Sequence, residues 1–361
     1  MSVVTLLGSD DDPEAIRAGV PFVDRWWTPT LHRPRAALRS VGAALTGRSL
    51  QVELYRSAAA RAATGAALAA VRPDVVVAHL VRTVSWLPDR SPPVIVDIQD
   101  ALSTQYERAS QLATGWRGLA MRLEQGRIAP VEQAAIARAD GVSFITEQDR
   151  TLLGPPPSVP SVVCRAVIDA DRFTPPSAGP ERALIGFAGK LATASNRDMA
   201  VHFARRILPL VRSARPEVRL EIVGVEAPAE VRRLDRLPGV RVVGAVDDMA
   251  AALGRFDLTV CPLRFGSGVQ NKVLESLAVG TPAVVSPSVA SSLEGSCLPA
   301  LGVAAVGRPF AMTLVELIAD RGRRDRMSAA GVEFVRRVHS PQAAMQDLLE
   351  LVESLARRER R

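Results

Sequence analysis

Short apolar runs separated by amphipathic stretches of helical length dominate the second half of the chain. The run 183–188 is apolar throughout and ends at a glycine, which is typical of a strand buried in a parallel sheet. Further strands are predicted at 218–223, 240–243, 258–262 and 283–285, and helices at 196–211 and 271–279. This alternation predicts an α/β domain, with helices on both faces of a parallel sheet.

The first half shows the same alternation less cleanly. Strands are predicted at 3–7, 74–78, 94–98 and 142–146, and helices at 52–71 and 118–139, while the Pro-rich stretch 174–180 has the composition of a linker. Two Rossmann-like domains would face a cleft lined by the carboxyl ends of both sheets. We therefore predict an N-terminal domain at 1–175, a C-terminal domain at 176–340, and a helix with a basic tail at 341–361 that can pack back on the N-terminal domain.

The composition fits two globular domains and narrows the class of partner. With 361 residues and 47% apolar content, the chain can form two cores. No apolar run approaches the roughly 20 residues of a membrane span, and the start shows no signal-peptide pattern, so we expect a cytoplasmic protein. The net charge of +7 includes a basic tail, and aromatic residues make up only 4%, so nucleic acid is not an expected partner. The three cysteines form no close pair and predict neither disulfides nor a metal site.

Lysine is almost excluded from the chain. Of the 45 basic residues only Lys190 and Lys272 are lysines, as expected of a lineage biased against lysine codons. A residue type that is nearly excluded can persist where its chemistry is needed, although two survivors are also compatible with chance.

Residues 265–282, with the sequence FGSGVQNKVLESLAVGTP, carry the densest chemistry, because they follow a predicted strand and open a predicted helix. Gly266 and Gly268 allow a ligand to approach the backbone closely. The helix N-terminus offers unpaired N–H groups and a positive dipole end suited to phosphate. Lys272 adds a charge in the first turn and shares a helix face with Glu275. For this pair alone, a solvated surface pair is the better interpretation, and only the combination with the strand, the Gly-x-Gly turn and the Gly-x-Pro exit favours a site.

This segment resembles the donor-binding signature of GT-B glycosyltransferases of family 4. The run 271–285 is close to a nearly diagnostic sequence of that family, in a form typical of bacterial sugar transferases of exopolysaccharide and protein-sorting loci. The resemblance covers most of the chain, strongly after residue 180 and weakly before it. It extends to Gly224 with 237–247 around the nucleobase, to 169–175 at the linker, and to an N-terminal Asp-rich element with Asp97, Asp100 and Ser103.

The resemblance implies an α/β fold of GT-B type and transfer of a sugar, with retention, from a nucleoside-diphosphate sugar to a small-molecule, glycan or lipid-linked acceptor. Glu275 would hold the ribose, and the two lysines would stabilise the leaving diphosphate, so no metal or other cofactor is expected. The implied donor-binding residues are Gly189, Lys190, Gly244, Ala245, Gly268, Val269, Gln270, Asn271, Lys272 and Glu275. The candidate catalytic residues are Lys190, Lys272, Asp100 and His79.

The chain departs from the family pattern at several places. Many family members have a first Glu eight residues before the ribose Glu, and this chain has Ser267 at that position. Where many members have a second basic residue, this chain has Ser195, with Arg197 nearby. Where many members have a His beside the donor sugar, the nearest match is Gln99. The strand at 3–7 is similar to the second strand of the family. We therefore expect the first strand–loop–helix unit to be missing, either because the acceptor side is remodelled or because the recorded start is too late.

Several alternatives stay open. Lys190 can be an ordinary loop charge, and His79 a structural histidine at the end of a strand. Trp26 and Trp27, among nearby arginines, are a membrane-contact candidate that we do not favour over a place in the core and its rim. The whole chain can be a sugar-nucleotide epimerase or a non-catalytic scaffold that binds a nucleotide sugar or a partner. Neither the donor base nor the acceptor can be chosen from the sequence.

Overall fold

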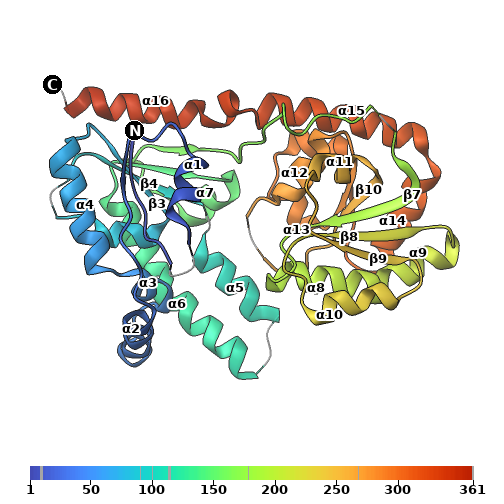
Figure 1. Ribbon diagram of the computed structural model, residues 1–361, viewed down its shortest axis with the longest axis horizontal. Helices are drawn as coiled ribbons and strands as arrows, with labels where there is room; N and C mark the ends of the chain where they lie inside the picture. Colours follow the sequence, from blue (N-terminus) through green and yellow to red (C-terminus); the bar gives the residue numbers. More distant parts are fainter. Residues whose placement is uncertain are drawn as a thin grey trace. The chain divides into compact units, whose positions relative to one another are not determined.

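The computed structural model describes residues 1–8, 11–89, 91–99, 101–112, 115–177, 179–266 and 268–359. The chain divides into two compact units, of which unit 1 comprises residues 1–164 and 347–361, and unit 2 comprises residues 165–346 (Figure 1). The division therefore lies before residue 165, whereas the composition placed it at 175. Pro175 and Pro176, in the predicted linker, pack beside Gly280 and Gly254 of unit 2.

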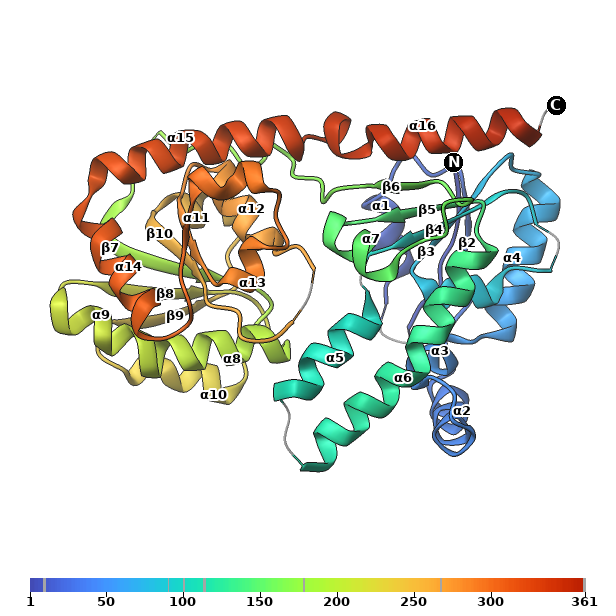
Figure 2. The ribbon, with the colours of Figure 1, turned by 180° about the vertical axis from the view of Figure 1, so that it is seen from behind.

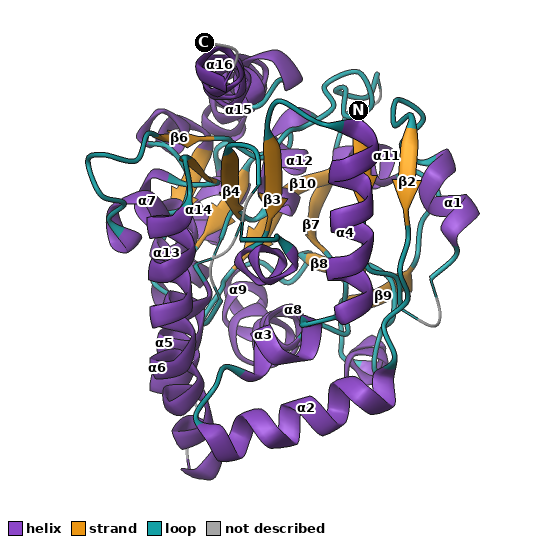
Figure 3. Ribbon diagram, turned by 90° about the vertical axis from the view of Figure 1, so that its left-hand side faces the viewer, coloured by secondary structure: helices purple, strands orange, loops and turns teal. Residues whose placement is uncertain are grey.

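Unit 1 contains a four-stranded parallel sheet in the order β3-β4-β5-β6 (Figure 3). The central strand β4 is buried at every residue, which explains its nearly continuous apolar sequence. A separate parallel pair, β1 with β2, holds Trp26 and Trp27 half-buried beside Val3 and Val4. The strands are β1 (Ser2–Val4), β2 (Arg25–Trp27), β3 (Val76–His79), β4 (Val94–Ile98), β5 (Gly141–Phe144) and β6 (Ser161–Val163).

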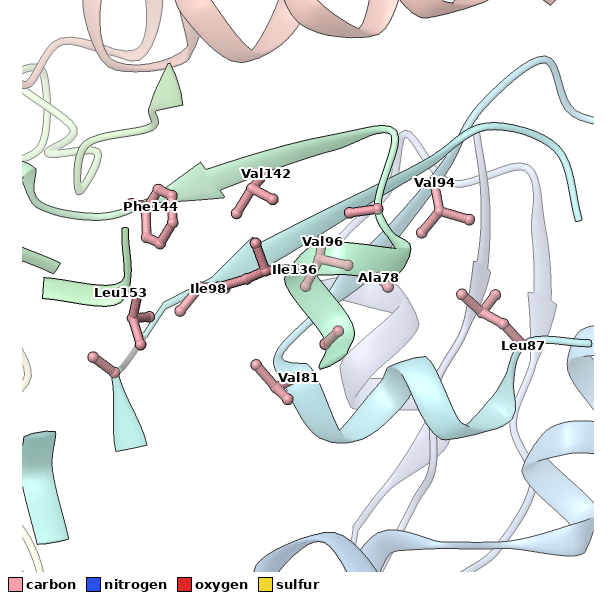
Figure 4. Packing of buried hydrophobic residues seen from close by; sticks show 13 residues of the cluster. Ala78, Val81, Leu87, Val94, Val96, Ile98, Ile136, Val142, Phe144 and Leu153 are labelled. Atoms are coloured by element: carbon pink, nitrogen blue, oxygen red, sulfur yellow. The ribbon is translucent and has the colours of Figure 1, made fainter. Parts of the chain in front are cut away.

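The core of unit 1 gathers around β4 and β5. Figure 4 shows Val96 and Ile98 of β4 beside Val142 and Phe144 of β5, together with Ile136 from a helix. The last helix of the chain also belongs to this unit from residue 347 onward, and it buries Leu348, Leu351 and Leu355.

The helices of unit 1 differ from the prediction in two ways. The α-helices at 13–18, 33–46, 102–112 and 147–153 were not predicted, and one predicted helix is broken. The helix predicted at 52–71 is interrupted at Arg56, which is extended, and Ser57 then caps a new helix by accepting a hydrogen bond from the Ala60 N–H at 3.2 Å. The helices are α1 (Pro13–Ala18), α2 (Arg33–Thr46), α3 (Leu50–Tyr55), α4 (Ala58–Val71), η1 (Val81–Trp86), α5 (Leu102–Leu112), α6 (Gly115–Arg138) and α7 (Glu147–Leu153).

Unit 2 contains a six-stranded parallel sheet in the order β12-β11-β10-β7-β8-β9. Counted from β7, this is the doubly wound order 3-2-1-4-5-6 of Rossmann-like folds. Figure 2 shows α8, α9 and α10 on one side of this sheet, and α11, α12 and α15 on the other. The strands are β7 (Glu181–Ala188), β8 (Arg219–Val223), β9 (Val240–Gly244), β10 (Phe256–Cys261), β11 (Ala283–Val285) and β12 (Leu301–Val303).

The helix predicted at 196–211 forms, but with a π-helical turn in its middle. Pro209 has no N–H to continue the α-helical pattern, and the turn just before it widens. No helix among the described residues is both long and apolar enough to cross a membrane. The helices from residue 165 onward are α8 (Ala194–His202), η2 (Phe203–Ile207), α9 (Leu208–Ala214), α10 (Ala229–Arg232), η3 (Arg233–Arg236), α11 (Met249–Gly254), α12 (Asn271–Ala278), α13 (Pro287–Ala290), η4 (Gly295–Ala300), α14 (Arg308–Ala319), α15 (Arg321–Val338) and α16 (Pro341–Glu359).

We predict that Gly186→Ala destabilises unit 2 by about 1–3 kcal/mol or more, because a side chain cannot fit there. A Cβ atom on Gly186, in β7, would lie 1.9 Å from Cδ2 of Phe256, a buried residue of β10. Gly65→Ala is the matched control, since a Cβ there meets no atom within 4 Å and the position is helical. That control should gain about 0.5–1 kcal/mol. Urea unfolding of both variants measures the difference, and equal stabilities would contradict the prediction.

Candidate functional site

The candidate site of unit 2 lies where the sheet topology switches direction. β7 and β10 are neighbours, yet the chain leaves β7 toward β8 on one side and leaves β10 toward β11 on the other. The loops after these two strands therefore diverge, and open α/β sheets bind ligands at the crevice that this leaves at the carboxyl edge. Gly189 and Lys190 follow β7, and the loop 262–270 that follows β10 leads into α12.

Three glycines bring the backbone together at this edge. The Gly224 N–H donates to the Gly244 carbonyl at 2.7 Å, and a Cβ on Gly224 would lie 1.8 Å from the Gly189 carbonyl oxygen. Gly224 and Gly244 have φ of +156° and +84°, in the region that favours glycine. No atom lies within 4 Å of a Cβ built on Gly244, and Ala245 beside it is exposed. The predicted base-side residues therefore form an open backbone surface.

One asparagine links the two lysines of the chain. The Lys272 Nζ donates to the Asn196 Oδ1 at 2.5 Å, and the Asn196 Nδ2 donates to the Lys190 carbonyl at 3.0 Å. The Thr193 hydroxyl donates to the same carbonyl at 3.0 Å. Asn196 is buried at the start of α8, so it fixes the loop after β7 against the first turn of α12.

The Lys272 ammonium is held in a largely apolar surrounding. Its Nζ lies 5.5 Å from the ring centroid of Phe187, within the range of a cation–π contact. Burial lowers the pKa of Lys272, and burial raises the pKa of the nearby Cys261 thiol to about 11. A poorly solvated cation gains more from an arriving anion than a fully hydrated one does.

Glu275 lies one helical turn beyond Lys272 and is half-buried. Among the described residues its carboxylate has no hydrogen-bond partner. Burial raises the pKa of Glu275, and the charges of Arg172 and Lys272 offset this only in part. The carboxylate is therefore available to accept hydrogen bonds from a ligand.

Backbone donors complete this part of the site. Gly266 and Gly268 have φ of +127° and +77°, and the loop they shape ends at Gln270, the N-cap of α12. The N–H groups of Asn271 and Lys272 donate to no described residue, as expected in the first turn of a helix. The Gln270 side chain donates to the Gly268 carbonyl at 3.4 Å. Ser267, which replaces the first family Glu, lies outside the described residues.

Lys190 carries the exposed charge of the site. Its Nζ lies 2.8 Å from the Glu226 carboxylate, and both side chains are more than half exposed. Such a surface pair is worth only about 0–1 kcal/mol, so a phosphate can displace Glu226 at little cost. Arg197 is also exposed nearby on α8, and Ser195 lies beside the loop at Gly266.

A second polar group lies at the carboxyl edge of the sheet in unit 1. The Asp97 carboxylate accepts hydrogen bonds from His79 Nδ1 at 2.7 Å, from the Ser143 hydroxyl at 2.6 Å and from Gln99 at 2.8 Å. Burial raises the pKa of Asp97, but these hydrogen bonds outweigh it and lower the pKa below the ordinary value.

This network orients His79. Since His79, Asp97 and Ser143 are aligned across β3, β4 and β5, the register itself brings them together. The His79 side chain is 63% exposed, so its Nε2 can reach a ligand while Nδ1 is held. Asp100 lies outside the described residues.

Asn196 links the two lysines of unit 2, and Asp97 holds His79 in unit 1. The sequence analysis did not assign these contacts to either residue. Asn196 is 76 positions from Lys272, and Asp97 is 18 positions from His79. Two features of the sequence could have pointed to these residues. Asn196 is a polar residue at the start of a helix, and Asp97 is an acidic residue inside an apolar strand. Among the described residues, no group of three or more His, Cys, Asp or Glu is placed to hold a metal ion.

Residues 182–320, most of unit 2, match the family model described as Glycosyl transferases group 1. A comparison with the sequences of curated proteins finds no match. The matched residues lie within unit 2 and make up less than half of the chain.

Solved structures resemble the chain over most of its length. Sucrose-phosphate synthase from Thermosynechococcus elongatus is 17% identical, with a TM-score of 0.67 over 84% of this chain and 78% of its own. A glycosyltransferase from Rickettsia africae is 10% identical, with a TM-score of 0.61 over 97% and 89%. The Anabaena protein HepE in complex with UDP and glucose is 12% identical, with a TM-score of 0.59 over 97% and 91%. At these identities the likeness establishes the fold, which is that of GT-B glycosyltransferases.

We predict that Glu275→Gln stabilises unit 2 near neutral pH, by a few tenths to about 1 kcal/mol, because it removes a poorly solvated charge. The folded-state pKa of Glu275 is raised, so the destabilisation is present above that pKa and disappears below the ordinary pKa of a glutamate. The variant should thus lose its advantage as the pH falls through this range. Thermal unfolding across the pH range measures it, and an advantage that persists in acid would contradict this origin.

Proposed function

We propose that this chain, whose residues 182–320 match the group 1 glycosyl transferases, transfers a sugar from a nucleoside-diphosphate sugar to an acceptor, without a metal ion and with retention at the anomeric carbon. The observation that carries the proposal is the convergence of both lysines, linked by Asn196, on the topological switch point of unit 2. A helix N-terminus lies in the same segment, as does the Glu275 carboxylate, which has no hydrogen-bond partner among the residues that the structure describes.

The diphosphate would bind between the loop after β7 and the first turn of α12. Lys272 and the backbone N–H groups from Gly268 to Asn271 would meet the phosphate oxygens, and Lys190 would leave Glu226 to do the same. These cations gain most when the sugar–phosphate bond breaks and charge develops on the diphosphate, so they stabilise the leaving group.

The nucleoside would extend along the same edge. Glu275 would accept both ribose hydroxyls through its free carboxylate oxygens, and the base would lie against the open backbone at Gly244 and Ala245. Because the backbone there presents no side chain at Gly244, it admits a planar ring closely. The Anabaena protein, which shares the fold, forms a complex with UDP, and this supports a nucleoside diphosphate as the ligand of this chain.

Unit 1 offers polar groups that suit a hydroxyl of a sugar or of an acceptor. His79, oriented by Asp97, and Asp100 are the candidate groups for a hydroxyl of either molecule. In the reaction, the bond from the anomeric carbon to the diphosphate oxygen breaks and its electron pair leaves with the nucleoside diphosphate. A bond to the acceptor oxygen forms, and the hydroxyl proton passes to the leaving phosphate.

A panel of UDP, GDP and dTDP sugars tests the function. We expect at least one of them to raise the melting temperature of the protein, and nucleotide release to require an acceptor. Binding without release from any acceptor would favour a scaffold, and interconversion of sugars without release would favour an epimerase. If no nucleotide sugar shifts the melting temperature, the proposal that unit 2 contains a donor site is wrong.

Removing either charge of α12 should weaken donor binding. Lys272→Ala and Glu275→Ala each remove a charged hydrogen bond worth about 1.5–3 kcal/mol, which corresponds to an increase of roughly 10- to 100-fold in Kd. Glu333→Ala is the control, since Glu333 is an exposed member of an i,i+4 pair on α15. Calorimetric titration with the best nucleotide of the panel measures each Kd, and unchanged binding in both α12 variants would exclude the proposed site.

Asn196→Ala should weaken the same binding although both lysines remain, because Lys272 loses its anchor. The double variant with Lys272→Ala should cost less than the sum of the two single changes, with a coupling of about 0.5–3 kcal/mol, since the two residues act through one contact. Additive effects would show that Asn196 acts only on the loop after β7.

A further inference from the structure

Arg82 carries a half-buried positive charge in the first turn of η1, close to the end of β3. A single residue, Leu80, separates His79 from η1, and its φ of +70° is unusual for a bulky side chain. The Thr83 hydroxyl donates to the carbonyls of His79 and Leu80 at 2.9 and 2.8 Å, which closes the turn. Strain of this kind persists only where the surrounding structure enforces it, and here it keeps Arg82 at the carboxyl edge of the sheet.

Helix α3 holds the guanidinium group of Arg82 in place. The Cζ atom lies 4.2 Å from the centroid of the Tyr55 ring, a close cation–π contact, and one nitrogen donates to the Gln51 Oε1 at 3.4 Å. The Trp86 indole N–H donates to the Tyr55 carbonyl at 3.0 Å, so α3 and η1 are tied together. The guanidinium group is therefore oriented before any ligand arrives.

The two acidic residues packed around α3 are engaged elsewhere. The buried carboxylate of Glu124, from α6, accepts hydrogen bonds from the Ser49 hydroxyl at 2.7 Å and from the Gln51 N–H at 3.1 Å. Glu53 of α3 forms ion pairs with two other arginines, at 3.3 and 3.7 Å. Among the residues that the structure describes, no carboxylate lies within ion-pair distance of Arg82, whose one hydrogen bond is the long contact with an amide.

Other half-buried arginines do have a carboxylate partner. Arg165 pairs with Glu294, and the Arg324 Nε lies 3.1 Å from Asp257. A guanidinium group has five N–H donors in a planar fork that matches a carboxylate or a phosphate. Partial burial deprives the Arg82 fork of some of its water, so an anion that pairs with it gains more than it would at an exposed arginine.

Both tyrosines of the chain lie at this cluster. Tyr55 stacks on the guanidinium group, and Tyr106 of α5 is half-buried within reach of the same charge. Burial raises the pKa of the Tyr106 hydroxyl, and the charge of Glu124 raises it as well. A hydrogen bond with Gln51 and the positive charge of Arg82 lower this pKa in part. The two tyrosine rings therefore report on anything that binds Arg82.

We propose that Arg82 binds an anionic group of the acceptor, either a phosphate or a carboxylate. The fork of the guanidinium would pair with two oxygens of the anion, while Tyr55 and Gln51 keep it oriented. A neutral acceptor would leave this charge unpaired. The anion is assigned to the acceptor because Arg82 lies three positions after His79, at the edge whose polar groups suit a hydroxyl. That assignment rests on the proposed function, whereas the binding of an anion at Arg82 does not.

NMR of the full chain with isotope-labelled tyrosine tests the binding, because both labelled rings lie at the site. We expect glycerol phosphate or glycolate to shift the tyrosine signals, and glycerol, the neutral counterpart, to leave them unchanged. A shift with only one of the two anions identifies the phosphate or the carboxylate as the group that is bound. The titration is made in the Lys272→Ala background, so that phosphate bound at the proposed donor site does not contribute.

Gln51→Glu is the sharpest variant, since it supplies the carboxylate that Arg82 lacks. The new carboxylate should occupy the guanidinium fork and raise the apparent Kd of the anion by about tenfold or more. Arg82→Gln should abolish the shift as well. Arg61→Gln is the matched control, because Arg61 is an exposed arginine of unit 1 whose nearest carboxylate, on Asp89, lies 3.8 Å away. Thermal unfolding establishes that the variants fold.

The absence of a shift with either anion overturns the proposal, as do shifts that persist in both Gln51→Glu and Arg82→Gln. These outcomes are independent of the donor site, because no nucleotide sugar is present. A transfer assay then tests the assignment to the acceptor: kcat/KM for an acceptor that bears the anion should fall about tenfold or more in Gln51→Glu, with the Kd of the nucleotide unchanged. Equal kcat/KM values with and without the substitution would overturn that assignment.

Discussion

The close pairing of β7 with β10 is the constraint on which the candidate donor site depends. The Phe256 ring fills the space that Gly186 leaves, and this lets the two central strands of the six-stranded sheet lie against each other. Because the chain leaves these strands in opposite directions, α8 and α12 both begin at the same edge. Asn196 and Lys272 can then meet, although they are far apart in the sequence.

The site is built at a cost in stability. Lys272 and Glu275 are both taken partly out of water, and burial shifts the pKa of each toward its neutral form. A fold selected for stability alone would place apolar residues in these positions, as α12 does at Val273 and Leu277. Charges that are poorly solvated before a ligand arrives are typical of a binding site, because the ligand then supplies the missing partner.

Both units present polar groups at the carboxyl edge of a parallel sheet, but the chemistry of these groups differs. In unit 2 the edge of the sheet presents backbone N–H groups and cations, which suit an anion. In unit 1 the corresponding edge presents His79, held by Asp97 and Ser143, which suits a hydroxyl group.

The sequence alone determined the α/β class, all of the strands except the short β2, β6 and β12, and the segment with Lys272 and Glu275, because these depend on local periodicity and on spacing within one helix. It also indicated the break in composition between the halves, although Pro175 and Pro176 pack on unit 2 and the division lies earlier. The tertiary structure alone decided the partners: Asn196 between the two lysines, Asp97 beside His79, and Glu226 beside Lys190. It also decided that Trp26 and Trp27 are half-buried while Trp116 is exposed. These contacts and exposures depend on the order of the strands and on which face of each helix is covered. Both are set by residues far apart in the sequence, so the local sequence pattern does not determine them.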